Sequence, residues 1–396
     1  MGCSSVTKQD NIISAEIEVN NDNSDCQIIN SINYHMSLHP YIILNDEDFE
    51  EGNKLEKELK NSDILINNKR IKFDYFYKFT KKGKYTIKYI FKNPLNSLKF
   101  LFTNCHHILS LDFSRFNTTQ ITNIEYMFAE CTNLTKINLT NFNTTNVKSM
   151  KYAFSECISI KYLDLSSFNF KNTTNAEGMF NRCEKLENID FNKIINSIKL
   201  KSMRLFLHDC QNLENIDLSN FSTENVEDFG CMFLNCKKLT NLDLSNFCTK
   251  NAENMALMFD NCHKLKNLNI SNFETPKVKT MQYMFHNCYS LTKLDLKKFN
   301  TENVTNFAFM FLNCYSLAYL DISNFNNSHA LCIDNMFSGC SSLITLDIQN
   351  FNLNKNLFTA NLFRDCYSLI YVLMPELDES HNFNSIFTNC NSLIHK

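Results

Sequence analysis

The chain has 396 residues, a net charge of −3 and only 6 Gly and 4 Pro. Scarce Gly and Pro exclude the collagen-like, linker-rich and Pro-rich classes, and the near-neutral charge argues neither for nor against a nucleic-acid partner. No apolar run reaches the length of about 18 residues that marks a membrane span, so the sequence predicts no transmembrane helix.

The first residues of the chain, Met-Gly-Cys-Ser-Ser-Val, resemble a lipidation signal. Gly2 can be myristoylated once Met is removed, Cys3 can be palmitoylated, and stable anchoring needs two such chains. The usual motif has Ser or Thr where this chain has Val6, so an ordinary polar start is the alternative. No basic stretch followed by an apolar one predicts a secretory signal peptide. The favoured location is therefore the cytoplasm, with the chain anchored at the inner face of a membrane.

Two segments precede the repeats. Residues 1–27 are predicted to be a flexible tether, since most of them are polar and rich in Asn and Asp. Residues 28–95 are predicted to form a small β-rich module that caps the first repeat, because solenoid ends need caps. Apolar and polar side chains alternate in residues 71–79 and 85–91, with Gly83 between them, which predicts a β-hairpin.

The predicted hairpin is strongly basic. The stretch from Lys69 to Lys92 holds nine basic residues and one acid. One interpretation is a patch that binds anionic lipid headgroups. The other, which we favour, is the solvated face of a half-buried hairpin whose lysines discourage edge-to-edge pairing.

A Phe-x-x-Cys motif recurs through residues 96–396, the third predicted segment. Twelve copies occur, one with Leu207 in the place of Phe, and successive cysteines lie 26 residues apart except for one gap of 27 and a last gap of 24. Chance does not keep such a register, so the segment is a repeat array. The cysteines of the motif are Cys105, Cys131, Cys157, Cys183, Cys210, Cys236, Cys262, Cys288, Cys314, Cys340, Cys366 and Cys390.

Each repeat has the pattern of a strand, a turn and a helix. In residues 278–303, five apolar residues fall at offsets 0, 3, 6, 7 and 10, which is one face of a short helix. Leu294 and Leu296 then alternate with polar residues, as in a half-buried strand. The expected fold class is therefore α/β, a solenoid of about 12 strand-turn-helix units whose stacking buries one continuous core.

Two blocks, Leu242-Asp-Leu-Ser-Asn-Phe247 and Met310-Phe-Leu-Asn-Cys-Tyr-Ser-Leu317, resemble the BspA-type leucine-rich-repeat surface proteins. The resemblance covers about three quarters of the chain and implies a leucine-rich-repeat solenoid with a role in adhesion or protein recognition. The chain departs from exported members of the family in lacking a signal sequence. It departs from the general leucine-rich pattern by placing Phe where Asn is usual. These residues are predicted to form a Phe spine: Phe142, Phe168, Phe221, Phe247, Phe273, Phe299, Phe325 and Phe351.

One Cys in each repeat lies at the end of the predicted helix. A metal-binding or disulfide column is one interpretation, and a small apolar residue packed in the core is the other. We favour packing, because no Cys-x-x-Cys or Cys/His zinc spacing occurs, and stacked cysteines that point the same way have poor disulfide geometry. We therefore expect no cofactor and no metal, and many buried thiols suit a reducing compartment.

The strands are expected to present a concave face of exposed columns. One interpretation is an acidic, hydroxyl-lined groove for a basic partner or cations, anchored by exposed tyrosines. The alternative is that the Asp and Ser side chains hydrogen-bond along the ladder and solvate the face. We favour this for the Asp column, because a residue repeated in nearly every unit serves the unit, and we assign recognition to the variable column. The central column includes Asp164, Asp190, Asp217, Asp243, Asp295 and Asp321, and the variable column includes Tyr162, Tyr319 and Tyr371.

Three classes of function are weighed. We favour a non-catalytic protein-recognition scaffold tethered to the cytoplasmic face of a membrane, with a protein partner and no nucleic acid. The alternative is a BspA-like cell-surface adhesin. The Asn-x-Thr triplets at Asn117, Asn143 and Asn303 would carry sugar if the chain passed through a glycosylating pathway. An enzyme is the least favoured class, because no Gly-rich phosphate loop and no nucleophile motif occurs.

Overall fold

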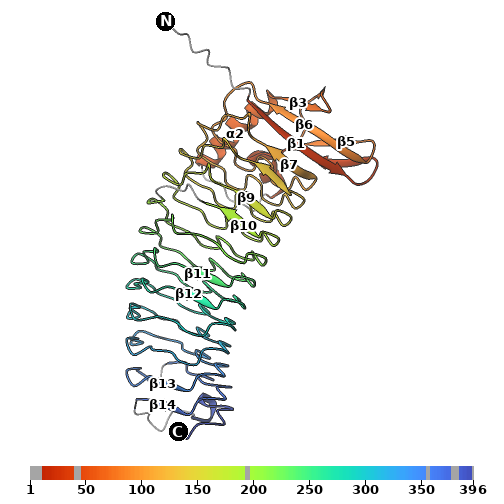
Figure 1. Ribbon diagram of the computed structural model, residues 1–396. Coiled ribbons are helices and arrows are strands. Elements are labelled where there is room, and N and C mark those ends of the chain that lie inside the picture. Colours follow the sequence, from red (N-terminus) through yellow and green to blue (C-terminus); the bar gives the residue numbers. More distant parts are fainter. Residues whose placement is uncertain (1–10, 40–45, 192–196, 354–356, 376–382, 395–396) are drawn as a thin grey trace. The chain divides into compact units, whose positions relative to one another are not determined.

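The structure is a computed structural model. By its internal contacts the chain divides into two compact units, Met1–Lys199 and Leu200–Lys396. Both units contain coils of the repeat, which Figure 1 shows as successive loops of chain, and the first unit also contains the N-terminal module. The residues that the structure describes are 11–39, 46–191, 197–353, 357–375 and 383–394.

A six-stranded sheet joins the N-terminal module to the first coils within the first unit. Its strands are β1 (Ile12–Val19), β3 (Asp63–Ile66), β4 (Lys69–Ile71), β6 (Gly83–Ile90), β7 (Ile108–Asp112) and β8 (Lys136–Asn138). The strand order is β4-β3-β6-β1-β7-β8. β1 runs antiparallel to β6 and β7, and β7 runs parallel to β8, so a strand from the start of the chain lies between the module and the coils (Figure 1).

The prediction of a flexible tether is wrong for residues 11–27. Ile13, Ala15, Ile17 and Val19 are buried on one side of β1, and the residues that alternate with them are more exposed. This strict alternation is the pattern of a half-buried strand, but the polar composition of the segment conceals it. The predicted lipidation residues Gly2 and Cys3 lie outside the described residues.

The predicted hairpin is also wrong, because its two strands pair with other partners. β5 (Phe76–Phe79) pairs with β2 (Ser24–Gln27), whereas β6 pairs with β1 and β3. Alternation identifies a strand but not its partner, and two of the three partners missed here, β1 and β2, lie in the first 27 residues. The module also contains two helices that the sequence pattern did not predict, α1 (Ile32–Leu38) and α2 (Asp46–Lys60).

Acidic side chains lie beside the basic strands of the module. Glu18 is opposite Lys84 where β1 pairs with β6. Asp63 forms ion pairs with Arg70 and, at 3.7 Å, with Lys92. These acidic neighbours fit a solvated sheet face better than a surface for anionic lipids, since they offset the positive charge of the stretch.

Tight turns replace the predicted helix of the repeat in the coils that the structure describes. The N–H groups of Met281 and Phe285 donate to the next coil, to the carbonyls of Asn306 and Met310, at 3.0 and 2.9 Å. The N–H of Met284, which lies between them, donates to the carbonyl of Met281, three residues back, at 3.1 Å. Alternate N–H groups therefore serve the neighbouring coil and the local turn, which is not the pattern of an α-helix.

Left-handed residues explain why the helix does not form. Tyr283 and Asn287 have φ angles of 58° and 56°, and the equivalent residues of the other coils have similar values. A left-handed residue interrupts a right-handed helix. The chain is therefore a β-solenoid, and the strand-turn-helix prediction is wrong about the helix. A run of three-residue turns buries side chains at the same offsets as a helix face, namely Val278, Met281, Met284, Phe285 and Cys288.

Short parallel ladders hold successive coils together. The first unit has one further pair, β9 (Tyr162–Asp164) with β10 (Asn188–Asp190). The second unit has β11 (Asn241–Asp243) with β12 (Asn267–Asn269), and β13 (Thr345–Asp347) with β14 (Tyr371–Leu373), followed by α3 (Phe383–Ile386). A second ladder of single-residue bridges lies elsewhere on the coils, as in the series Asn254, Thr280 and Asn306.

Two columns of Phe fill the core of the coils. Phe285, from the Phe-x-x-Cys motif, stacks between Phe259 and Phe311 with ring centroids 5.6 and 5.5 Å away. The predicted Phe spine is confirmed, since its members are buried and neighbours such as Phe299 and Phe325 stack at 6.3 Å. Stacked aromatic side chains therefore join each coil to the next through the core.

The cysteine of each motif packs in the core and also makes a hydrogen bond. The thiol of Cys288 donates to the carbonyl of Phe259 in the preceding coil at 3.2 Å, and the thiol of Cys314 donates to that of Phe285 at 3.1 Å. Within the described residues no cysteine forms a disulfide. The packing interpretation is therefore confirmed, and the weak S–H donor gives Cys a role that Ala could not fill.

We expect thiol reagents to distinguish two classes of cysteine. Cys231, Cys248 and Cys332 are half-buried, whereas the motif cysteines are buried, and burial raises the pKa of thiols such as that of Cys288. Because the thiolate is the reacting form, an alkylating reagent should modify the half-buried class first, as read by peptide mass spectrometry. Denaturant should make all of them react, and labelling of motif cysteines in the native protein would contradict the buried ladder.

Candidate functional site

The strands of the coils carry the predicted recognition columns on their exposed side. We call this surface the strand face, and we describe it separately in each unit. In the first unit, Tyr162 and Asp164 lie on β9, with Asp190 beside Asp164 on β10. The middle residue of β9, Leu163, is buried, so its two neighbours point outward.

In the second unit the strand face holds six of the predicted residues. Tyr319 and Tyr371 are 67% and 40% exposed, and Tyr162 of the first unit is 53% exposed. All three side chains are therefore accessible to a partner. The other four predicted residues on this face are Asp217, Asp243, Asp295 and Asp321.

The repeated Asp of the strand face closes a turn within its own coil. One carboxylate oxygen of Asp243 accepts the backbone N–H of Ser245 at 2.9 Å, and Asp321 accepts that of Ser323 at 3.1 Å. The N–H of Ser245 lowers the pKa of the Asp243 carboxyl below its ordinary value. Asp243 and Asp321 therefore each close an Asx turn at the end of their strand, and the lowered pKa of Asp243 keeps its carboxylate ionised at neutral pH.

A groove of about 910 Å³ runs along the strand face of the second unit. The amide of Asn267 donates to the amide oxygen of Asn241 at 2.6 Å, so the side chains of neighbouring coils are linked along the groove. Amides, carboxylates and hydroxyls of this kind can hydrogen-bond a polar partner. The groove is also lined by apolar side chains, of which Leu242 is buried and Ile216, Leu268 and Leu294 are half-buried. The polar lining is Asn215, Asp217, Ser219, Asn241, Asp243, Ser245, Asn246, Asn267, Asn269, Ser271, Lys293 and Asp295.

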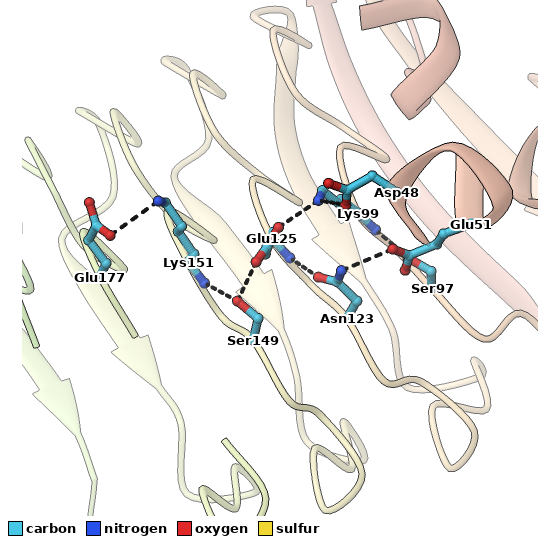
Figure 2. A network of polar contacts seen from close by, with 9 residues as sticks. All are labelled: Asp48, Glu51, Ser97, Lys99, Asn123, Glu125, Ser149, Lys151 and Glu177. Carbon is cyan, nitrogen blue, oxygen red and sulfur yellow. Dashed lines mark hydrogen bonds and ion pairs between the residues drawn. The ribbon is translucent and has the colours of Figure 1, made fainter. Parts of the chain in front are cut away.

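A second polar cluster fastens α2 to the first coils (Figure 2). The buried ammonium of Lys99 lies 2.5 Å from Asp48 of α2 and 2.7 Å from Glu125 of the next coil. Glu51 of α2 accepts a hydrogen bond from the amide of Asn123 at 3.1 Å. Burial alone would lower the pKa of Lys99, but the attraction of Glu125 and Asp48 outweighs it and raises the pKa. The cluster therefore has a structural role in holding the module against the coils.

Neither cluster has the geometry of a metal centre. Among the described residues, no group of three or more His, Cys, Asp or Glu side chains is placed to hold a metal ion. The helices in the described ranges are all too short or too polar to cross a membrane.

The comparisons with solved structures give distant likenesses. The chain is similar to a leucine rich cell surface protein from Faecalibacterium prausnitzii A2-165, with 16% identity over 82% of this chain and 84% of that chain and a TM-score of 0.39. It is similar to a leucine-rich repeat protein from Bacteroides ovatus ATCC 8483, with 17% identity over 73% and 77% of the two chains and a TM-score of 0.30. No curated protein matches the chain.

A family model gives the stronger match. The family described as "Mycoplasma protein of unknown function, DUF285" matches residues 96–203, 186–294 and 290–395, which together span the repeat array. The match confirms the resemblance to BspA-type leucine-rich-repeat proteins that the repeat blocks carry. The chain therefore belongs to the family of Mycoplasma proteins of unknown function, DUF285.

Proposed function

We propose that the chain is a non-catalytic, protein-binding repeat scaffold that acts at the cell surface, in the manner of BspA-like adhesins. The observation that carries the proposal is that two columns of the strand face have different roles. The repeated Asp is used within its own coil, whereas the exposed residue two positions before it is Tyr, Asn, Lys or Thr in different coils. A repeat protein of this kind keeps its fold while its binding surface varies.

The variable column supports recognition because the coil does not need any particular residue there. The exposed position of Tyr319 is filled by Thr345 in the next coil and by Lys293 in the preceding one. Tyr is a residue that protein interfaces favour, since it offers a large contact area and a hydroxyl at low cost in side-chain entropy. A protein partner on the strand face is therefore the function that the geometry supports best.

The cell surface replaces the cytoplasmic face of a membrane as the proposed location. The resemblance to BspA-type proteins implies surface display, whereas the anchored cytoplasmic scaffold depends on Gly2 and Cys3, outside the described residues.

External protease tests the location. In intact source cells that carry a C-terminally tagged chain, we expect added protease to remove the tag while a cytoplasmic marker protein survives. The matched variant is Gly2→Ala, which blocks myristoylation and should leave this result unchanged. A tag that stays protected, on a protein that Gly2→Ala releases from membranes, would instead establish the cytoplasmic scaffold.

A further inference from the structure

Exposed apolar side chains gather in the last coils of the second unit. Of the fourteen large apolar side chains with high exposure in the described residues, nine lie beyond residue 314. Scattered exposed apolar residues are ordinary, but a concentration of them marks an interaction surface. Seven of the nine lie within five residues after a motif cysteine, and the last of these is Ile394. We call the six that precede it the end patch: Tyr315, Tyr319, Ile344, Tyr367, Ile370 and Tyr371.

The end patch is continuous from coil to coil. The N–H of Ile370 donates to the carbonyl of Ile344 at 2.8 Å, and the N–H of Ile344 donates to Ala318 in the coil before. Tyr371 lies beside Thr345 in the pairing of β13 with β14. The two isoleucines and the tyrosines beside them therefore share one surface, at one end of the strand face of the second unit.

The rim of the end patch is acidic. Asp321 and Asp347 occupy the Asp column of the same coils. Hydrogen bonds from Ser323 and, as a smaller cause, the positive charge of Lys297 in the preceding coil lower the pKa of Asp321. Residues 319–323 and 345–349 contain no Lys or Arg. Arg364, which precedes Tyr367 in the chain, is engaged by Asp365 at 3.3 Å. An apolar centre with a negative rim complements a partner that carries apolar and positive side chains.

We propose that the end patch docks a basic polypeptide segment with apolar side chains, which rests on the proposed function and specifies its partner. The apolar side chains of the segment cover Ile344 and Ile370, the tyrosines flank them, and Lys or Arg side chains meet Asp321 and Asp347. A second copy of this chain fits less well, since an isologous contact would bring Asp rims together. An anionic membrane is repelled by the same rim.

Peptide selection on the full-length chain tests the proposal. Short random peptides displayed on phage are selected against the protein, and the enriched peptides are synthesised with a fluorescent label as probes. We expect sequences that combine Lys or Arg with apolar residues. Binding should weaken roughly tenfold or more in the double variant Tyr319→Ser/Tyr371→Ser, as loss of interface tyrosines does elsewhere. Phe49→Ser removes a comparably exposed aromatic side chain from α2, outside the strand face, and should leave binding unchanged.

The charge of the rim is tested separately. Asp321→Asn with Asp347→Asn removes two charges but keeps the turns, because Asn269 already accepts the N–H of Ser271 at the same place in another coil. We expect weaker binding of the basic probes and a smaller dependence on salt.

Three results would contradict the proposal that the end patch docks a basic polypeptide segment. Probes that bind the double variant as well as the wild type would place the contact elsewhere, and the proposed function would stand. Selection of acidic peptides, or of none, would remove the stated partner chemistry. Self-association that the double variant abolishes would identify a second copy as the occupant. A tag protected from external protease, by contrast, counts against the proposed function alone.

Discussion

Replacing Lys99 with Met is expected to destabilise the first unit by about 3–5 kcal/mol, as loss of one partner from a buried ion pair does. The side chain of Lys99 is 6% exposed, and those of Asp48 and Glu125 are 22% and 17% exposed. Without the ammonium, two carboxylates face each other in a poorly solvated place (Figure 2). Because Asp48 belongs to α2, the helix should also separate from the coils.

Hydrogen exchange followed by mass spectrometry measures this effect in the intact chain. In Lys99→Met, peptides that cover α2 and β7 should lose protection, and the denaturant midpoint of the first unit should fall. The matched control is Lys161→Met, which breaks the exposed Lys161–Glu187 pair of 2.9 Å and should cost less than about 1 kcal/mol. Equal effects of the two substitutions would show that the buried cluster does not hold α2.

Replacing Phe285 with Ala is expected to cost about 3–5 kcal/mol in the second unit, the usual range for a buried Phe. Its ring is fully buried and stacks on two neighbours, so the substitution leaves a cavity that borders three coils. In a repeat array each coil contacts mainly its neighbours, so the loss of protection should concentrate around the substituted coil.

Phe358 offers a matched control, because it is a Phe of the same unit that is 66% exposed. Phe358→Ala should change stability by less than about 0.5 kcal/mol. Denaturant unfolding compares the two variants, and hydrogen exchange locates the change. A loss of protection spread evenly over the second unit in Phe285→Ala would contradict nearest-neighbour coupling.

The period of the coils could be predicted from the sequence because the residues that recur with it are the buried ones. Burial explains why these features could be predicted: the Phe and Cys positions, the Phe spine and the alternation around Leu163 and Leu242. The pattern of apolar residues along the sequence indicates directly which side chains are buried. The prediction of a helix was wrong because a run of three-residue turns buries side chains at the same sequence offsets as one face of a helix. The distinguishing signal was the Asn at positions such as Asn261, Asn287 and Asn313, since Asn tolerates the left-handed conformation found there.

The pairing of strands that lie far apart in the chain could not be predicted from the local sequence pattern. Nothing in residues 12–19 states that this strand pairs with residues 83–90 and 108–112. The end patch was missed for a related reason. It arises because the residue four positions after the motif cysteine changes from Thr292 through Ala318 to Ile344 and Ile370, which becomes evident only when the coils are stacked.

The position of β1 also governs the order of events as the chain leaves the ribosome. Ser14 pairs with Asp112, so β1 cannot complete this pairing until the first coil has been synthesised. Later coils meet no such delay, because a residue such as Ser110 pairs with Lys136, 26 residues further on. The N-terminal module is therefore completed only when the first coil is present, and later coils then add to it one after another. If translation stops within a later coil, we expect the N-terminal part of the chain still to be folded.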